Sequence, residues 1–134
     1  MAELIYVDAN GTLNFGDYTL DTKAKADGFE FQGDLYKIKT YREITKLEKN
    51  GLFIYESVPG TTVTKFKAEE REVTFEVEGK EDTQIILELE PDKEYKIYID
   101  DIQAGKMKPN FGGKLVLSAE LTQTKTTKVR VVKL

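Results

Sequence analysis

Apolar and polar residues alternate almost without interruption from Arg71 to the C-terminus. The alternation runs through REVTFEVE, TQIILELE, EYKIYID, AGKM, KLVLSAEL and TKVRVVKL, and turn-forming residues such as Gly79, Pro91-Asp92 and Gly112-Gly113 separate these stretches. A period of two is typical of a strand with one buried face. Six short strands at this spacing predict an all-β fold, and specifically a β-sandwich.

The alternation also predicts which side chains face the core. We expect the apolar member of each alternating pair to point inward and the polar member to point to solvent. The expected inward set is Val73, Phe75, Val77, Thr83, Ile85, Leu87, Leu89, Tyr95, Ile97, Ile99, Leu115, Leu117, Ala119, Leu121, Val129 and Val131.

Some apolar residues break the alternation, because they fall on the outward positions of the predicted strands. These residues are Ile86, Tyr98, Val116, Val132 and Leu134. A solvated sheet face does not normally collect so many apolar side chains. We therefore expect a cover over them. The cover is either the first half of the chain, laid across the sheet as a third layer, or a neighbouring subunit in a homo-oligomer.

The first half of the chain predicts two hairpins. IYV and TLNF flank a turn at Asn10-Gly11, and ITKLE and LFIYESV flank a turn at Asn50-Gly51. Asn-Gly supplies the positive φ angles that a two-residue hairpin turn requires. A two-residue turn at Asn50-Gly51 sets Leu47 opposite Ile54 and Glu48 opposite Phe53. The alternative for YREITKLEK is a short helix, since its residues are good helix formers.

The length of the chain and the absence of a linker-like stretch favour one compact unit. A chain of 134 residues is long enough to bury a hydrophobic core. The stretch VPGTT at 58–62 is the best boundary between two halves, and no linker-like tract occurs. We expect a hairpin-rich N-terminal half, 1–66, packed on a sandwich half, 67–134.

Composition narrows the chemistry that the chain can perform. It contains no cysteine, histidine or tryptophan. Thiolate metal sites, disulfides and cysteine nucleophiles are therefore excluded, and so is the usual general base near neutral pH. We expect no metal and no cofactor. Catalysis by two carboxylates in a cleft stays open, which keeps a small glycan-acting enzyme as a hypothesis.

Charge indicates neither a nucleic-acid partner nor a membrane partner. The net charge is −4, from 20 basic and 24 acidic residues that are mixed along the chain. Neither half forms a basic footprint, and no apolar run reaches membrane-spanning length. The N-terminal residues lack the apolar core of a signal peptide, so we expect a cytoplasmic protein if Met1 is the native start.

Two short motifs resemble ligand loops and are interpreted as turns. NFGGKL looks like the end of a P-loop, but Lys108 stands where the first glycine belongs and Leu115 where Ser or Thr belongs. Asp8 and Asn10 imitate the start of a calcium loop, but Thr19 stands where the bidentate Glu belongs.

Two segments of the sequence resemble known groups of proteins. EYKIYIDDIQAGKMKPNFGGKLVLSAEL resembles the closing hairpins of immunoglobulin-like and fibronectin-type sandwich modules. This resemblance implies an immunoglobulin-like β-sandwich with an additional β-rich N-terminal half. GDLYKIKTYREITKLEKNGLFIYESVPGT is similar to small uncharacterised proteins of anaerobic Gram-positive bacteria, some of which are labelled endosialidase.

The endosialidase label implies particular residues and motifs that can be looked for in the sequence. A sialidase-type site clamps a carboxylate with arginines, and the chain has Arg42, Arg71 and Arg130. The repeated S-x-D-x-G-x-T-W boxes of that family are missing, so no catalytic residue is carried over.

Three functions follow, in order of preference. The first is a non-enzymatic structural or assembly protein that acts through self-association. The second is a carbohydrate-binding accessory module, in which Tyr36, Tyr41, Tyr55 and Tyr98 offer exposed rings for stacking on sugars. The third is the glycan-acting enzyme.

Overall fold

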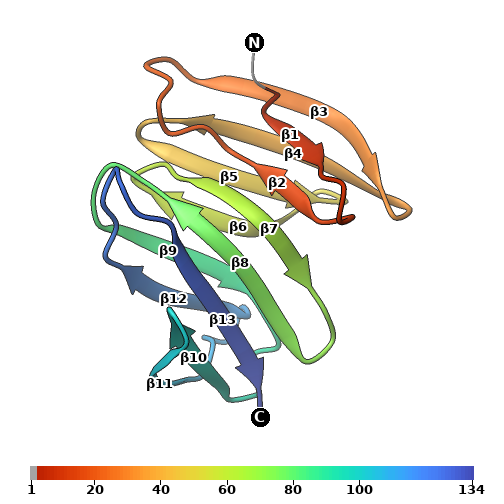
Figure 1. Cartoon of the computed structure of the whole chain (residues 1–134). Helices are drawn as coiled ribbons and strands as arrows, with labels where there is room; N and C mark the ends of the chain where they lie inside the picture. The colour runs from red at the N-terminus through yellow and green to blue at the C-terminus, as the bar shows by residue number, and fades with distance from the viewer. Residues whose placement is uncertain (1–2) are drawn as a thin grey trace.

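The computed structural model describes residues 3–134, and within this range the chain forms strands and no helix (Figure 1). The thirteen strands are β1 (Ile5–Val7), β2 (Leu13–Phe15), β3 (Ala24–Phe31), β4 (Asp34–Tyr41), β5 (Ile44–Lys49), β6 (Leu52–Val58), β7 (Thr62–Ala68), β8 (Glu72–Glu78), β9 (Thr83–Glu88), β10 (Tyr95–Ile99), β11 (Ile102–Met107), β12 (Lys114–Ala119) and β13 (Thr127–Lys133). The all-β prediction is confirmed. The six strands expected after Arg71 correspond to β8 to β13.

Two antiparallel sheets pack face to face as a β-sandwich. Sheet A has seven strands in the order β1-β2-β7-β8-β13-β10-β11, and sheet B has six in the order β12-β9-β6-β5-β4-β3. Strands β1 and β3 lie at the end of the molecule near the N-terminus, and β11 and β12 lie at the opposite end (Figure 1). Every named strand pair is antiparallel.

The first half of the chain does not form a third layer over the second. Strands β1, β2 and β7 join sheet A, while β3 to β6 join sheet B. The expected division between residues 66 and 67 falls inside β7. Both sheets therefore draw strands from both halves, because the chain crosses between sheets after β2, β6, β8, β9, β11 and β12.

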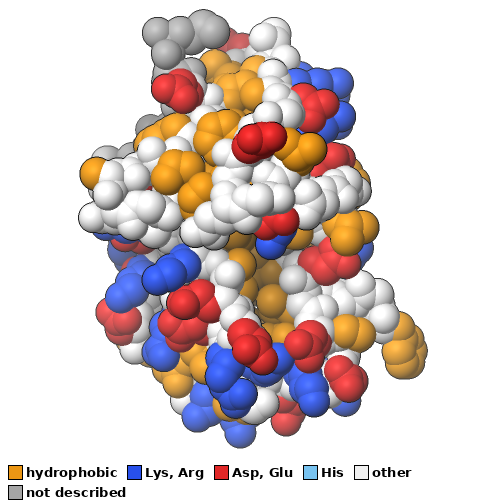
Figure 2. All heavy atoms as spheres, turned by 90° about the vertical axis from the view of Figure 1, so that its right-hand side faces the viewer, with side chains coloured by type: hydrophobic (Ala, Val, Ile, Leu, Met, Phe, Trp, Pro, Cys, Tyr) orange, Lys and Arg blue, Asp and Glu red, His pale blue; other side chains and the backbone are white. Residues whose placement is uncertain are grey.

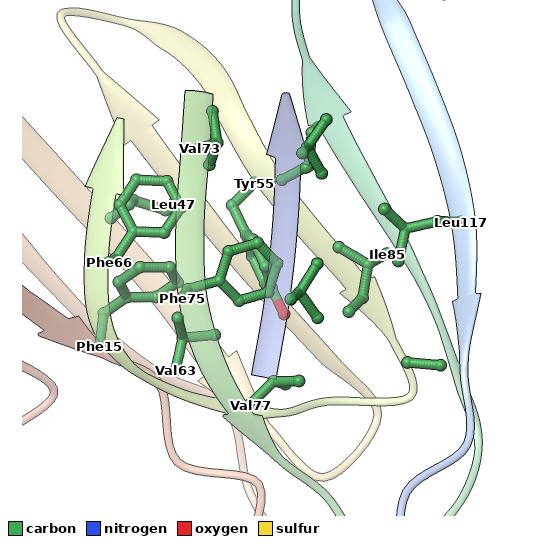
Figure 3. Packing of buried hydrophobic residues seen from close by; sticks show 14 of the residues in the cluster. Phe15, Leu47, Tyr55, Val63, Phe66, Val73, Phe75, Val77, Ile85 and Leu117 are labelled. Atoms are coloured by element: carbon green, nitrogen blue, oxygen red, sulfur yellow. The ribbon is translucent and has the colours of Figure 1, made fainter. Parts of the chain in front are cut away.

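The core lies between the two sheets and is built on an aromatic cluster (Figure 3). Phe15 packs edge-on against Tyr55 and Phe66, with ring centroids 5.2 and 5.4 Å apart. Phe75 lies 5.7 Å from Tyr55 and 5.8 Å from Phe66. Burial of each such side chain stabilises the folded state by roughly 1.5–3 kcal/mol. The expected inward set is confirmed, with Leu89 and Ile99 only partly buried.

The hairpin turn between β5 and β6 forms as the sequence predicts. Asn50 and Gly51 both have positive φ, 53° and 83°. The Asn50 side chain accepts a hydrogen bond from the Leu35 amide and donates one to Asp34. These bonds tie the turn to the neighbouring hairpin, so residues 41–49 form strand and turn rather than the alternative helix.

The register of this hairpin shifts by one residue just beyond the turn. Glu48 lies opposite Phe53, as expected, but Leu47 lies opposite Tyr55. The predicted pairing of Leu47 with Ile54 is therefore wrong. A bulge at Ile54 moves Tyr55 to the inner face, where its ring enters the aromatic cluster.

Candidate functional site

The five apolar residues predicted to form one face lie on two different faces. Ile86 on β9 and Val116 on β12 are cross-strand partners on the outer face of sheet B. Tyr98 on β10 and Val132 on β13 belong to the outer face of sheet A, and Leu134 follows β13. The outer faces of a sandwich point in opposite directions, so the structure does not bring these residues together. The five residues therefore form two separate surfaces rather than one self-association or inter-layer face, and their part in self-association stays a prediction.

The sheet A group is partly covered by its own neighbours. The Arg130 guanidinium lies 5.1 Å from the centre of the Tyr98 ring and pairs with Glu72 at 3.1 Å. Val132 is half-buried between Lys96 and Glu72 on the flanking strands. Local stacking and long polar side chains therefore shield much of this apolar surface.

Strands β11 and β12 form an open end of the molecule. Five of the six β11 side-chain positions are exposed, and Ile102 is 72% exposed. One side of β11 pairs with β10, and within residues 3–134 its other side has no strand neighbour. The edge of β12 is open from Val116 onward, whereas at Lys114 the backbone amide and carbonyl both bond to Asn110. Unpaired backbone groups on such an edge are a template for another strand.

Phe111 projects fully exposed from a rigid turn between β11 and β12. The Asn110 carboxamide oxygen accepts hydrogen bonds from the amides of Gly112 and Lys114, at 2.9 and 3.0 Å. Pro109 is buried, and Leu89 donates its amide to the Gly113 carbonyl. The interpretation of NFGGKL as a turn is thus confirmed. The backbone that carries Phe111 therefore needs little further ordering to present the ring to a partner.

The opposite end of the molecule carries an apolar hollow between the edge strands β1 and β3. It has a volume of about 480 Å³ and is lined by Leu4, Ile5, Ala26 and Phe29 among others. Carboxylates at Glu3 and Asp27 also line it. Neither carboxylate forms an ion pair with another residue in the described part of the chain.

A lysine face, made by Lys23, Lys25, Lys37, Lys39 and Lys46, occupies the outer side of sheet B. Lys25 lies opposite Lys39, which lies opposite Lys46. Partial desolvation and the charges of the four other lysines lower the pKa of the Lys39 ammonium. Among residues 3–134 only Lys46 of this set has an ion-pair partner. Sequence reasoning missed this face, although pairs two residues apart, such as Lys37 and Lys39, signal one side of a strand.

The turn at Asp8 uses its carboxylate internally. That carboxylate accepts hydrogen bonds from the amides of Asn10 and Thr12, the Thr12 hydroxyl and the Asn14 carboxamide. The bonds from Thr12 and Asn14 contribute most, and together the set lowers the pKa of Asp8 to about 2. The turn interpretation of this motif is confirmed, but the predicted two-residue turn at Asn10-Gly11 is wrong, because residues 8–12 form the loop and Gly11 has positive φ while Asn10 does not.

Two further clefts are present in the described part of the molecule. Figure 2 shows a hollow with apolar side chains in its depth and charged ones around it, on the side where the turn between β7 and β8 lies. A groove of about 570 Å³ there includes Ile54, Val73 and Tyr95. Another cleft, of about 430 Å³, mixes the cations of Arg42 and Lys80 with two glutamates.

The residues considered for glycan chemistry are not brought together. Arg42 pairs loosely with Asp21, at 3.9 Å, and Arg130 pairs with Glu72, while Arg71 lies in the turn before β8. The cleft that contains Arg42 contains neither other arginine.

Two of the four tyrosines proposed as sugar platforms are unavailable. Tyr36 is 7% exposed and Tyr55 is 1% exposed, so both belong to the core. The expectation that these rings face solvent is wrong. Tyr41 and Tyr98 are partly exposed.

No group of three or more metal-ligating side chains gathers within residues 3–134, and no helix in this range could cross a membrane.

Comparisons with protein-family models, with curated proteins and with solved structures found no match. The resemblances to immunoglobulin-like modules and to proteins labelled endosialidase therefore stay predictions.

Proposed function

We propose that the protein is a non-enzymatic structural protein that acts through self-association. The observation that supports this proposal is that, within residues 3–134, no strand pairs with the outer side of either edge strand in either sheet. Strands β1 and β3 leave one end unpaired, and β11 and β12 leave the other. Natural sandwiches usually blunt or cover such edges, because an exposed edge pairs readily with another chain.

Apolar side chains at the β11 and β12 end add to the support. Ile102, Met107, Phe111 and Val116 are all exposed there. A partner that removes such a side chain from water gains roughly 1.5–3 kcal/mol for each one that becomes fully buried. A few of these contacts, added to strand pairing, are enough to offset the entropy lost on association.

Static light scattering over a concentration series tests the proposal. The mean mass should rise above that of the 15.3 kDa monomer as concentration increases. Ile102→Lys combined with Phe111→Ser should shift that rise to higher concentration. Val58→Ser is a matched control, since Val58 is also apolar and exposed but lies on β6, away from both ends. A monomeric mass at every concentration would refute self-association.

The lysine face supports a second candidate function, the binding of an anionic polysaccharide. Tyr41 and Phe53 flank the lysines and already stack with Lys23 and Lys46, at 5.8 and 4.9 Å. Rings beside cations offer both stacking and charge to an acidic sugar. In this proposal the lysine charges provide much of the sugar binding that the sequence analysis assigned to exposed tyrosines.

Titration with polygalacturonate, with neutral dextran as the comparison, tests this second candidate. Binding should be selective for the acidic polymer and should weaken as salt rises, because exposed charges are screened. Lys39→Glu should weaken it, whereas Lys93→Glu, an equal charge change in the turn before β10, should alter it much less. Equal affinity for both polymers would argue against the lysine face as the site.

A further inference from the structure

We propose that the contact between copies is an antiparallel pair formed by β12 of one copy and β3 of the next, arranged head to tail. This inference rests on the proposed self-association and names its geometry. Three independent features of the described residues support it: strand direction, the order of charges along both edges, and the apolar surfaces beside them.

The relative direction of the two edge strands of a sheet follows from its number of strands. Neighbours are antiparallel throughout, so the first and last strands of six-stranded sheet B run in opposite directions. In seven-stranded sheet A they run in the same direction. Copies stacked end to end along the long axis of Figure 1 therefore present β12 to β3 as antiparallel strands. Such a pair is the more stable type and extends sheet B without reorienting either copy.

The order of charges also selects the antiparallel pair. β12 begins at Lys114 and is followed by Glu120, while β3 is preceded by Lys23 and nearly ends at Glu30. Antiparallel pairing sets Lys114 opposite Glu30 and Glu120 opposite Lys23. Parallel pairing would set like charges opposite each other at both ends, which is unfavourable.

The spacing between Lys114 and Glu120 matches the spacing between Glu30 and Lys23 once the bulge in β3 is counted. β3 has one residue more than β4 between Ala26 and Phe29. With the Lys114 side chain opposite that of Glu30, the bulge falls opposite Val116, and Ser118 then lies opposite Lys25. Because the Lys114 amide and carbonyl already bond to Asn110, the backbone pairing starts at Val116. The β12 side chains and their β3 counterparts all belong to the outer side of sheet B, as their own cross-strand partners show.

These charged side chains are available for a partner. Lys23, Glu30, Lys114 and Glu120 are all exposed, and none forms an ion pair among residues 3–134. A carboxylate arriving near Lys23 also offsets repulsion within the lysine face. The contact therefore adds opposite charges where each copy alone leaves them unmatched.

Apolar surfaces lie beside the proposed strand pair at both ends. The hollow between β1 and β3 is lined by Leu4, Ile5, Ala26 and Phe29, and Ile102 and Met107 are exposed on β11 at the opposite end. Continuation of sheet B brings the β11 end of one copy toward the β1 end of the next (Figure 1). A contact between two different surfaces repeats without closing, unless the rotation per copy forms a ring, so the expected assembly is a filament.

Reversing the charge of Lys114 or of Glu30 tests the proposed contact, and mixing the two variants should restore association. Lys114→Glu should weaken association by roughly three- to tenfold, because the new carboxylate on β12 of one copy then meets Glu30 of the next. Glu30→Lys should do the same, because two ammonium groups then meet. A mixture of the two variants should associate nearly as strongly as wild type, because junctions that join one variant's β12 to the other's β3 can again pair opposite charges.

Two controls separate this contact from other effects. Lys93→Glu carries the same charge change in an exposed turn and should leave association unchanged. Melting temperatures of all variants should match wild type, since the substituted side chains are exposed and unpaired. Wild-type association that persists unaltered in Lys114→Glu and Glu30→Lys, or a mixture that shows no rescue, refutes the strand pair but leaves self-association standing. A monomeric wild type refutes both.

Disulfide trapping tests the register, and the absence of cysteine gives it a clean background. A double variant, Ser118→Cys with Lys25→Cys, should form a ladder of cross-linked copies under mild oxidation. Each single variant supplies one thiol per copy and should not cross-link in a head-to-tail assembly. Efficient dimer formation by either single variant would instead indicate a symmetric contact and overturn the proposal.

Discussion

The hydroxyl of Tyr55 lies 2.8 Å from the hydroxyl of Thr61 inside the core, where both side chains are buried. Ser57 contacts the same Thr61 hydroxyl at 2.7 Å, and Thr45 bonds to both the amide and the carbonyl of Thr61. Thr61 therefore joins strands of sheet B to the segment that crosses to sheet A.

Thr61→Val should lower the free energy of unfolding by about 2–4 kcal/mol, because it leaves the Tyr55 and Ser57 hydroxyls buried without this partner. Urea unfolding measures the loss. Thr74→Val makes the same change on the outer face of β8 and should cost less than about 0.5 kcal/mol. Equal effects of the two substitutions would mean that the buried hydroxyl cluster contributes little.

Gly60→Ala should be strongly destabilising, by more than about 2 kcal/mol. A Cβ at this position would lie 2.0 Å from the Tyr41 carbonyl oxygen, and the backbone cannot retreat easily, since the Gly60 amide donates to the Arg42 carbonyl. Gly112→Ala is the matched control, because its nearest neighbour is a side-chain oxygen at 3.4 Å. Thermal melts of the two variants should differ clearly, with Gly112→Ala near wild type.

The stability of the protein should fall as pH drops from about 4 to about 2. The pKa of Asp8 is about 2 in the folded protein, against 3.8 for a free side chain. A lowered carboxyl pKa means that its stabilising contribution is complete above the unfolded pKa and is lost as pH falls through the folded value.

Comparison with Asp8→Asn isolates this effect, because asparagine does not titrate. The difference in melting temperature between wild type and Asp8→Asn should be constant above about pH 5 and should shrink towards pH 2. Hydrogen bonds from Lys128 and Lys125 also lower the pKa of Asp100, so the variant should keep part of the acid sensitivity. A difference that stays constant down to pH 2 would show that Asp8 titrates normally.

The strands of the second half could be predicted because their alternation is local and unbroken. The period of two placed Val73, Ile85 and Val129 on the core side without knowledge of their partners. The paired strands β3 and β4 were not predicted. In β3 the alternation is interrupted by a bulge between Ala26 and Phe29, and half of its side chains are exposed because it is an edge strand.

The candidate site could not be predicted because it depends on which sheet each strand joins. β9 and β12 belong to sheet B, while β10, β11 and β13 belong to sheet A, although all five follow one another in the sequence. Long-range pairing decides this membership, and it separates Ile86 and Val116 from Tyr98 and Val132. The open edges that support our proposals are a property of the strand order, which the local pattern does not contain.

The placement of Ile86 on an outer face gives a sharp test of the absence of a third layer. Ile85 is 0% exposed, and its neighbour Ile86 is half-buried on the opposite side of β9, beside Val116, which is 41% exposed. Ile86→Lys with Val116→Lys should therefore leave a folded protein with a cooperative melt, costing at most about 1–2 kcal/mol, since a lysine stem covers the same surface while its charge reaches water. Ile85→Lys should abolish folding, because it places an unpaired charge in the core. Circular dichroism melts distinguish the outcomes, and loss of cooperativity in the outer-face variant would mean that another part of the chain covers that face.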